Sequence, residues 1–136
     1  MAHAILEAEV QRRGLLVGVC SASTWNFDGT MAAMEGRLVC EKHNTPMSKL
    51  LATPLSNLDL SDAVRVLVME RAHIAEVLAQ TGALPERVSL LGAFDPEKGD
   101  EEIEDPIGKE MEAYEACYIR MRGCITHYLD TTRDFE

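Results

Sequence analysis

Residues 64–69 constrain the fold more than any other part of this sequence. The run Val-Arg-Val-Leu-Val-Met is dense in β-branched side chains and predicts a strand. An amphipathic helix is predicted next, over 72–80, with Gly82 just beyond its end, and a second short strand follows at 88–91. Strands joined by a helix in this way pair in parallel, so we expect an α/β fold.

The amino-terminal half continues the same alternation. Apolar residues at helical spacing predict helices over 2–13 and 31–43, and a short apolar run with two valines predicts a buried strand over 15–22. Ser-Asn-Leu-Asp after a proline predicts a short helix over 56–63. The inner face of the 31–43 helix is predicted to carry Met34, Leu38 and Val39.

A long final helix is predicted over 110–129. One face of it carries large apolar and aromatic residues at helical spacing, which is typical of a core stripe: Met111, Tyr114, Tyr118, Met121, Ile125 and Tyr128. The whole pattern predicts one domain over 1–136, with a three-layer, doubly wound sheet of short parallel strands and helices on both faces. In such folds ligands bind beyond the carboxyl ends of the strands.

Charge and composition exclude several classes of function. The formal net charge is −10, which argues against general binding to nucleic acid or to an anionic membrane, because phosphates are held by clustered Lys and Arg. No stretch approaches the roughly eighteen apolar residues of a membrane span. The first ten residues carry early charges and no long apolar run, unlike a secretory signal peptide. We therefore predict a cytoplasmic protein.

The cysteines and histidines show no metal-ligand spacing. The four cysteines are far apart, without Cys-x-x-Cys, and are predicted to be reduced and structural. The histidines are equally scattered, so we predict neither a metal nor another cofactor. They are His3, His43, His73 and His127.

Two places hold polar residues where a ligand would bind. The acidic run 95–105 is typical of a solvated loop, and Asp105 begins an Asp-Pro-Ile-Gly sequence that by itself indicates no more than a turn. Trp25 and Asn26 follow the predicted strand 15–22 in a Ser/Thr-rich context. Trp25 either lines a ligand pocket or covers the edge of the core.

Three stretches together resemble the low-molecular-weight protein tyrosine phosphatases. The first is 19–29, Val-Cys-Ser-Ala-Ser-Thr-Trp-Asn-Phe-Asp-Gly. The second is 66–69, Val-Leu-Val-Met, with His73 on the helix that follows. The third and most specific runs over 90–108, from Leu-Leu-Gly-Ala-Phe-Asp-Pro to Glu-Asp-Pro-Ile-Gly. The resemblance covers nearly the whole chain.

The resemblance implies roles for four residues. Asp105 would be the general acid that protonates the phenolate as tyrosine leaves. Trp25, Asn26 and Ile107 would line the pocket for the phosphotyrosine ring. The expected substrate is therefore a phosphotyrosine protein or a small aryl phosphate.

The family's nucleophile motif, Cys-x5-Arg, does not occur in these residues. The sixth residue after each cysteine is not arginine but Asn26, Pro46, Gly123 or Asp130. The resemblance also implies that the normally central first strand is missing, as in a truncated product, and predicts a Cys-x5-Arg run encoded in frame ahead of Met1. The family's supporting His aligns with Leu50, and its Gly in Ser-Ala-Gly aligns with Ser23. We expect no hydrolysis by the chain as given.

Two other functions stay open at this point. The chain could be a non-catalytic, phosphatase-like binding module, completed by a strand from a partner or by self-association. It also resembles, more weakly, the related arsenate reductases. Those use an extra redox cysteine pair, and residues 70–90 contain no cysteine.

Overall fold

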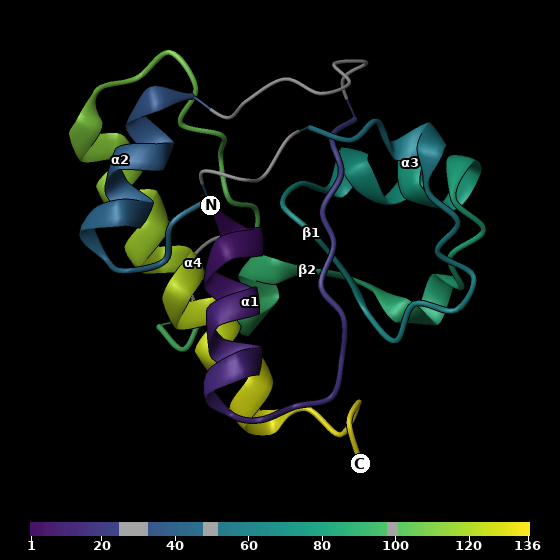
Figure 1. The fold of residues 1–136 in the computed structure, drawn as a ribbon. Coiled ribbons are helices and arrows are strands. Elements are labelled where there is room, and N and C mark those ends of the chain that lie inside the picture. Colours follow the sequence, from purple (N-terminus) through teal and green to yellow (C-terminus); the bar gives the residue numbers. More distant parts are fainter. Residues whose placement is uncertain (25–32, 48–51, 98–100) are drawn as a thin grey trace.

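The computed structural model describes residues 1–24, 33–47, 52–97 and 101–136, which form helices packed around a small parallel sheet (Figure 1). The helices and strands are α1 (Ala2–Arg12), α2 (Met34–Lys42), β1 (Val66–Val68), α3 (Arg71–Gln80), β2 (Val88–Leu90) and α4 (Met111–Thr131). Short 3-10 turns cover Leu55–Asn57, Pro85–Arg87 and Leu91–Phe94.

The β1–α3–β2 unit confirms the predicted parallel pairing. Val66 lies opposite Val88 and Val68 opposite Leu90, and α3 connects the two strands. Glu70 and His73 cap the first turn of α3, where the Glu70 N–H donates to His73 Nδ1 at 3.3 Å. The strands are short because only three residues of each find a partner.

The sheet separates two apolar cores, which makes the molecule three layers deep. Val68 packs with Val77 of α3 and Leu90 of β2 on one face. Leu67 points to the other face, where α1, α2 and α4 build the larger core. In Figure 1, α3 accordingly lies on one side of the strands and the other three helices on the opposite side. The α/β architecture predicted from the sequence is confirmed.

Helix α4 is the centre of the larger core. Its stripe is buried from Tyr114 to Tyr128, as predicted, whereas Met111 at its start is exposed. The Tyr118 ring stacks on His43 with the ring centres 4.4 Å apart, and its hydroxyl lies 2.7 Å from Thr45 Oγ1. These contacts join the end of α2 to the middle of α4.

The predicted inner face of α2 is partly wrong. Val39 is buried, but Met34 and Leu38 are 62% and 46% exposed. Gly36 faces α4 instead, and a Cβ there would lie 3.6 Å from the Tyr114 ring. Such a Cβ would make an ordinary contact, so the face that packs against α4 is the one with Gly36, and α2 is rotated relative to the prediction. Residues 31 and 32 lie outside the described part of the chain.

The predicted strand over 15–22 is also wrong. The segment is extended, but it pairs with no described strand, and Leu16 is fully exposed. Only Ser23, at its end, forms an isolated parallel bridge, with Pro54. A β-strand is defined by backbone hydrogen bonds to a neighbouring strand, and this segment has no such neighbour among the described residues. The predicted helix over 56–63 shrinks to the turn Leu55–Asn57.

The carboxyl-terminal residues are tied to the start of β1. Arg65 donates from Nε and Nη2 to the Asp134 carboxylate at 2.9 and 3.0 Å, and from Nη1 to Ser89 Oγ at 2.9 Å. The Tyr128 hydroxyl donates to the same carboxylate at 2.7 Å. These bonds hold the pKa of Asp134 well below its usual range, with Arg65 as the main cause. Across the described residues, we find no helix that could span a bilayer.

Candidate active site

The candidate site lies at the carboxyl ends of β1 and β2. The backbone of Met69, directly after β1, accepts a hydrogen bond from the Ile103 N–H at 2.9 Å. The 3-10 turn Leu91–Phe94 follows directly after β2 and leads into the acidic run. The loop that carries Asp105 therefore crosses the edge of the sheet where ligands bind in parallel α/β folds.

The sequence suggested that the acidic run is a solvated loop. In the structure, its described residues are instead fixed by contacts with the helices and the core. Arg120 of α4 donates from Nε to Asp95 Oδ2 at 3.0 Å and from Nη1 to the Glu102 carbonyl at 2.9 Å. The Arg71 N–H at the start of α3 donates to Glu102 Oε2 at 2.8 Å. The side chain of Ile103 is only 3% exposed and belongs to the larger core.

A glycine allows the loop to pass close to β2. A Cβ placed on Gly92 would lie 2.1 Å from the carbonyl oxygen of Glu101. That distance is far shorter than atoms tolerate, so no larger residue fits here without moving the loop. Gly92 therefore lets the backbone of Glu101, ahead of Asp105, lie directly against the turn that follows β2.

Asp105 opens a compact turn before α4. Its Oδ1 accepts the Ile107 N–H at 3.0 Å, and the Lys109 N–H donates to the Pro106 carbonyl at 2.9 Å. Pro106 is buried, and Gly108 takes a φ of +78°, which favours glycine. Asp105 itself is exposed. The turn fixes the backbone and leaves one carboxylate oxygen free of this bond.

The charge of Asp105 reaches the first turns of α4. Burial raises the pKa of the Tyr114 phenol, and the negative charges of Glu35 and Asp105 add to the shift. Burial likewise raises the pKa of the Cys117 thiol, and Asp105 again adds to it. The Asp105 charge therefore acts on two side chains in the first two turns of α4.

The structure places two of the four predicted site residues together. Asp105 and Ile107 belong to one turn, in which the Ile107 N–H contacts the carboxylate, and Ile107 is 55% exposed. Trp25 and Asn26 lie outside the described residues, directly after Ser23 and Thr24. Their predicted role as pocket walls stays a prediction.

Sequence reasoning missed the residues that position this turn. Ile103 was hidden in the acidic run, although an isolated Ile among carboxylates is the one signal that could have revealed an anchor. Arg120 stands between Tyr118 and Met121 of the core stripe, and its role depends on a loop that is distant in sequence. Within the described ranges, no three His, Cys, Asp or Glu side chains are grouped to hold a metal ion.

A sequence model described as "Low molecular weight phosphotyrosine protein phosphatase" matches residues 1–133. The chain belongs to this family. The match covers α1 through α4, including the turn at Asp105. A search among curated proteins finds no match.

Solved structures of tyrosine phosphatases share the fold. The low molecular weight protein tyrosine phosphatase from T. tengcongensis superposes with a TM-score of 0.83 at 22% identity, over 96% of this chain and 88% of that one. The Erwinia amylovora tyrosine phosphatase AmsI gives 0.80 at 20% identity, over 97% and 83%. Vibrio vulnificus Wzb, solved with benzylphosphonate, gives 0.80 at 17%, over 96% and 88%. At such identities the likeness shows the fold.

Proposed function

We propose that Asp105 is the general acid of a phosphomonoester site at the carboxyl edge of the sheet. The observation that carries the proposal is the turn itself. The carboxylate is exposed, its backbone is held by the buried Pro106 and the Ile107 N–H, and the loop behind it is anchored in the core. A general acid needs such a fixed position, because it must reach the leaving oxygen as the bond breaks.

The substrate class we propose is an aryl phosphate, either phosphotyrosine in a protein or a small molecule. Membership of the family supports this class. The benzylphosphonate bound by Vibrio vulnificus Wzb has the same combination of an aromatic ring and a phosphorus oxyanion. The exposed Ile107 beside Asp105 offers an apolar surface for such a ring.

We further propose that residues 1–136 do not turn over substrate on their own, because they supply no nucleophile. Cys40, Cys117 and Cys124 lie within α2 and α4, and burial raises the pKa of each thiol, to about 11 for Cys124. A thiol of that kind is a poor nucleophile, since only the thiolate attacks phosphorus. Cys20 lies in the extended segment 15–22, with Asn26 rather than Arg six residues later.

Hydrolysis of p-nitrophenyl phosphate tests the proposal. The chain and its four single Cys→Ser variants should all show no turnover above the buffer rate. Titration with benzylphosphonate, followed by amide chemical shifts, should move the signals of Asp105, Ile107 and Gly108 more than that of Ser61, which lies outside the proposed site. Turnover that disappears when one cysteine is replaced would refute the missing nucleophile, and unmoved signals at Asp105, Ile107 and Gly108 would refute the site.

A second function follows from the unpaired segment 15–22. A chain of this family without turnover can serve as a binding module whose sheet is completed by a strand from a partner or by self-association. The extended segment without a described neighbour favours this function. We infer a cytoplasmic location for either function.

A further inference from the structure

Two large apolar side chains follow Asp105 on the surface of the protein. Ile107 is 55% exposed within the turn that Asp105 opens, and Met111 is 40% exposed at the first residue of α4. The Lys109 N–H donates to the Pro106 carbonyl at 2.9 Å, so the chain turns between them. The ring of a small aryl phosphate would occupy Ile107 alone. Met111 is therefore left for a larger substrate.

Two acids flank Met111 at the start of α4. Glu110 precedes the helix and makes no side-chain capping hydrogen bond, and Glu112 belongs to the first turn. Both side chains are exposed, and neither forms an ion pair with a described residue. The neighbouring Lys109 is already paired, with its Nζ 2.9 Å from Glu104 Oε1. The negative charge of the two acids therefore stays available to a ligand.

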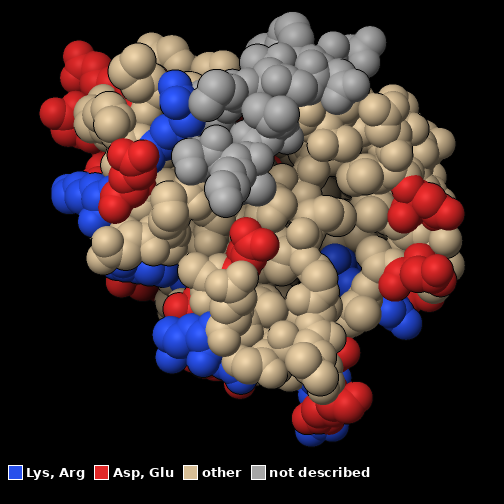
Figure 2. Space-filling view, in the orientation of Figure 1, with Lys and Arg blue, Asp and Glu red and all other residues tan. Residues whose placement is uncertain are grey.

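Helix α2 adds a third acid, Glu35, in its first turn. This end of α2 packs on α4, since a Cβ on Gly36 would lie 3.6 Å from the Tyr114 ring. Burial raises the pKa of the Tyr114 phenol most, and the charges of Glu35 and Asp105 raise it further. In Figure 2, acidic groups with uncharged side chains between them lie at the upper left, where Figure 1 places α2 and the start of α4.

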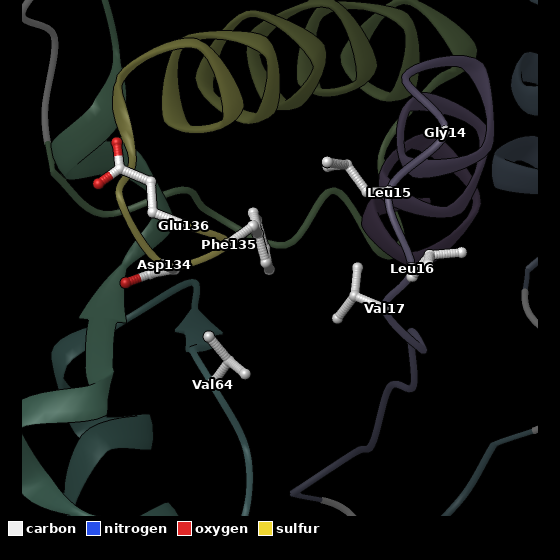
Figure 3. A pocket seen from close by; sticks show the side chains of 8 residues that line it. All are labelled: Gly14, Leu15, Leu16, Val17, Val64, Asp134, Phe135 and Glu136. Atoms are coloured by element: carbon white, nitrogen blue, oxygen red, sulfur yellow. The ribbon is translucent and has the colours of Figure 1, made fainter.

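A cavity of about 450 Å³ lies at another part of the molecule. Figure 3 shows it between residues 15–17 and 134–136, next to Val64, which stands ahead of β1. This is the amino end of β1, whereas the loop that carries Asp105 crosses the carboxyl ends of the strands. The cavity is therefore not part of the site at Asp105.

We call Ile107, Met111, Glu35, Glu110 and Glu112 the flanking surface. We propose that it selects the substrate, a protein segment in which apolar residues flank the phosphotyrosine and a basic residue lies beyond them. The inference rests on the proposed function and chooses between its two substrate classes. With the aryl ring at Ile107, the next apolar side chain contacts Met111, and a lysine or arginine meets the acids beside it.

Charge favours a basic protein segment over a small aryl phosphate. A phosphate group is negative, so the acids near Asp105 and the formal net charge of −10 both repel it. A lysine or arginine near the phosphotyrosine offsets this repulsion through the flanking surface, without contacting the phosphate. A protein segment can carry such a cation, whereas a simple aryl phosphate such as p-nitrophenyl phosphate cannot. An acidic segment would add to the repulsion.

Binding of matched peptides tests the inference on the chain as it stands. The probes are two acetylated and amidated peptides, Lys-Val-pTyr-Val-Lys and Glu-Val-pTyr-Val-Glu, added at millimolar concentration. By amide chemical shifts of Ile107 and Glu112 at low salt, the lysine peptide should bind about tenfold more tightly. This ratio should fall to about twofold in roughly 0.5 M salt, which screens exposed charges. Serine in place of both valines should weaken the lysine peptide about threefold or more.

Two double variants with the same net charge locate the effect. Glu110→Gln with Glu112→Gln should reduce the ratio between the peptides from about tenfold to about threefold or less. Glu76→Gln with Glu86→Gln removes the same charge from α3 and from the turn Pro85–Arg87, and should leave the ratio unchanged. An equal reduction in both double variants would mean general attraction to an acidic chain and would overturn the inference.

The result for the flanking surface is separable from the result for the proposed site. If benzylphosphonate moves the Asp105 signal while the two peptides bind equally, the site stands and the inference is refuted. If the lysine peptide moves the Glu112 signal while benzylphosphonate moves nothing at Asp105, the proposed function fails and the surface keeps a basic ligand. No binding of the lysine peptide would also overturn the inference.

Discussion

The loop 95–105 and segment 15–22 reverse what their sequences suggest. The loop is acidic, yet Arg120 and Ile103 bind it to α4 and the core. The segment is apolar and rich in valine, yet no described neighbour pairs with its backbone from Leu16 to Ala22. The difference teaches that contacts with distant residues decide which part of a chain is held in place. Local composition does not, because a strand needs an edge and a loop needs only a few anchors.

The same charge introduced in both regions should have very different costs. Ile103→Asp puts a carboxylate into the larger core and should lower the free energy of unfolding by more than about 4 kcal/mol. Val17→Asp, in segment 15–22, should lower it by about 1 kcal/mol or less. Urea denaturation measures both. Equal costs would mean that segment 15–22 is packed as firmly as the loop.

Two glycines provide a steric version of the comparison. Gly92→Ala forces the loop away from β2, because the new Cβ would overlap the Glu101 carbonyl, and should cost about 2 kcal/mol. Gly18→Ala meets nothing within 4 Å and should change stability by less than about 0.5 kcal/mol. Thermal unfolding of the two variants checks this, and a neutral Gly92→Ala would show that the loop moves easily.

The ion pair between Arg65 and Asp134 should make the free energy of unfolding depend on pH. Asp134→Asn weakens the pairing with Arg65 and should cost about 1 kcal/mol at pH 7. Since Arg65 lowers the pKa of Asp134 in the folded chain, this stability is present above the unfolded pKa of about 3.9 and is lost as pH falls through the lower folded value. The gap between the chain and its variant should therefore persist from pH 7 to 5 and narrow below about pH 4. A gap that grows in acid would contradict the assignment.

Thiol reactivity should give the smallest effects. Cys20 is exposed in segment 15–22, whereas Cys117 is half-buried with a raised pKa, so iodoacetamide should modify Cys20 about tenfold faster or more. Asp105→Asn removes a negative charge near Cys117, which lowers its pKa and should speed its modification at pH 8. Glu104→Gln is the control, because Glu104 pairs with Lys109 and should leave Cys117 unchanged. Peptide mapping by mass spectrometry separates the sites.

Much of the fold and one part of the site could be predicted from the sequence. The run 64–69, the helix after it and the strand 88–91 specify a parallel unit, because β-branched residues, helical spacing and a short connection agree. The stripe on α4 is equally readable. The turn at Asp105 could be predicted because Asp-Pro-Ile-Gly favours one through local chemistry, and the structure places that turn at the carboxyl edge of the sheet. The role of Asp105 as an acid came from the family resemblance and stays a prediction.

The rest depended on contacts between residues far apart in the sequence. The face of α2 could not be read from hydrophobicity, because Gly36 lies on the buried face while the apolar Met34 and Leu38 are exposed. Arg120 looked like one more charge on a helix until the loop lay beside it. Such effects depend on shape, and the apolar pattern of a sequence carries no information on shape.

The sequence by itself determined which segments have the character of helices and strands and where the turn at Asp105 falls, because these depend on neighbouring residues. Only the tertiary structure decided which of these segments are fixed by contacts with residues distant in the sequence. It anchored an acidic loop through Ile103 and Arg120, and it left the strand-like segment 15–22 beside a groove. The physical reason is that backbone pairing and burial require a partner surface, and a partner is a property of the assembled fold.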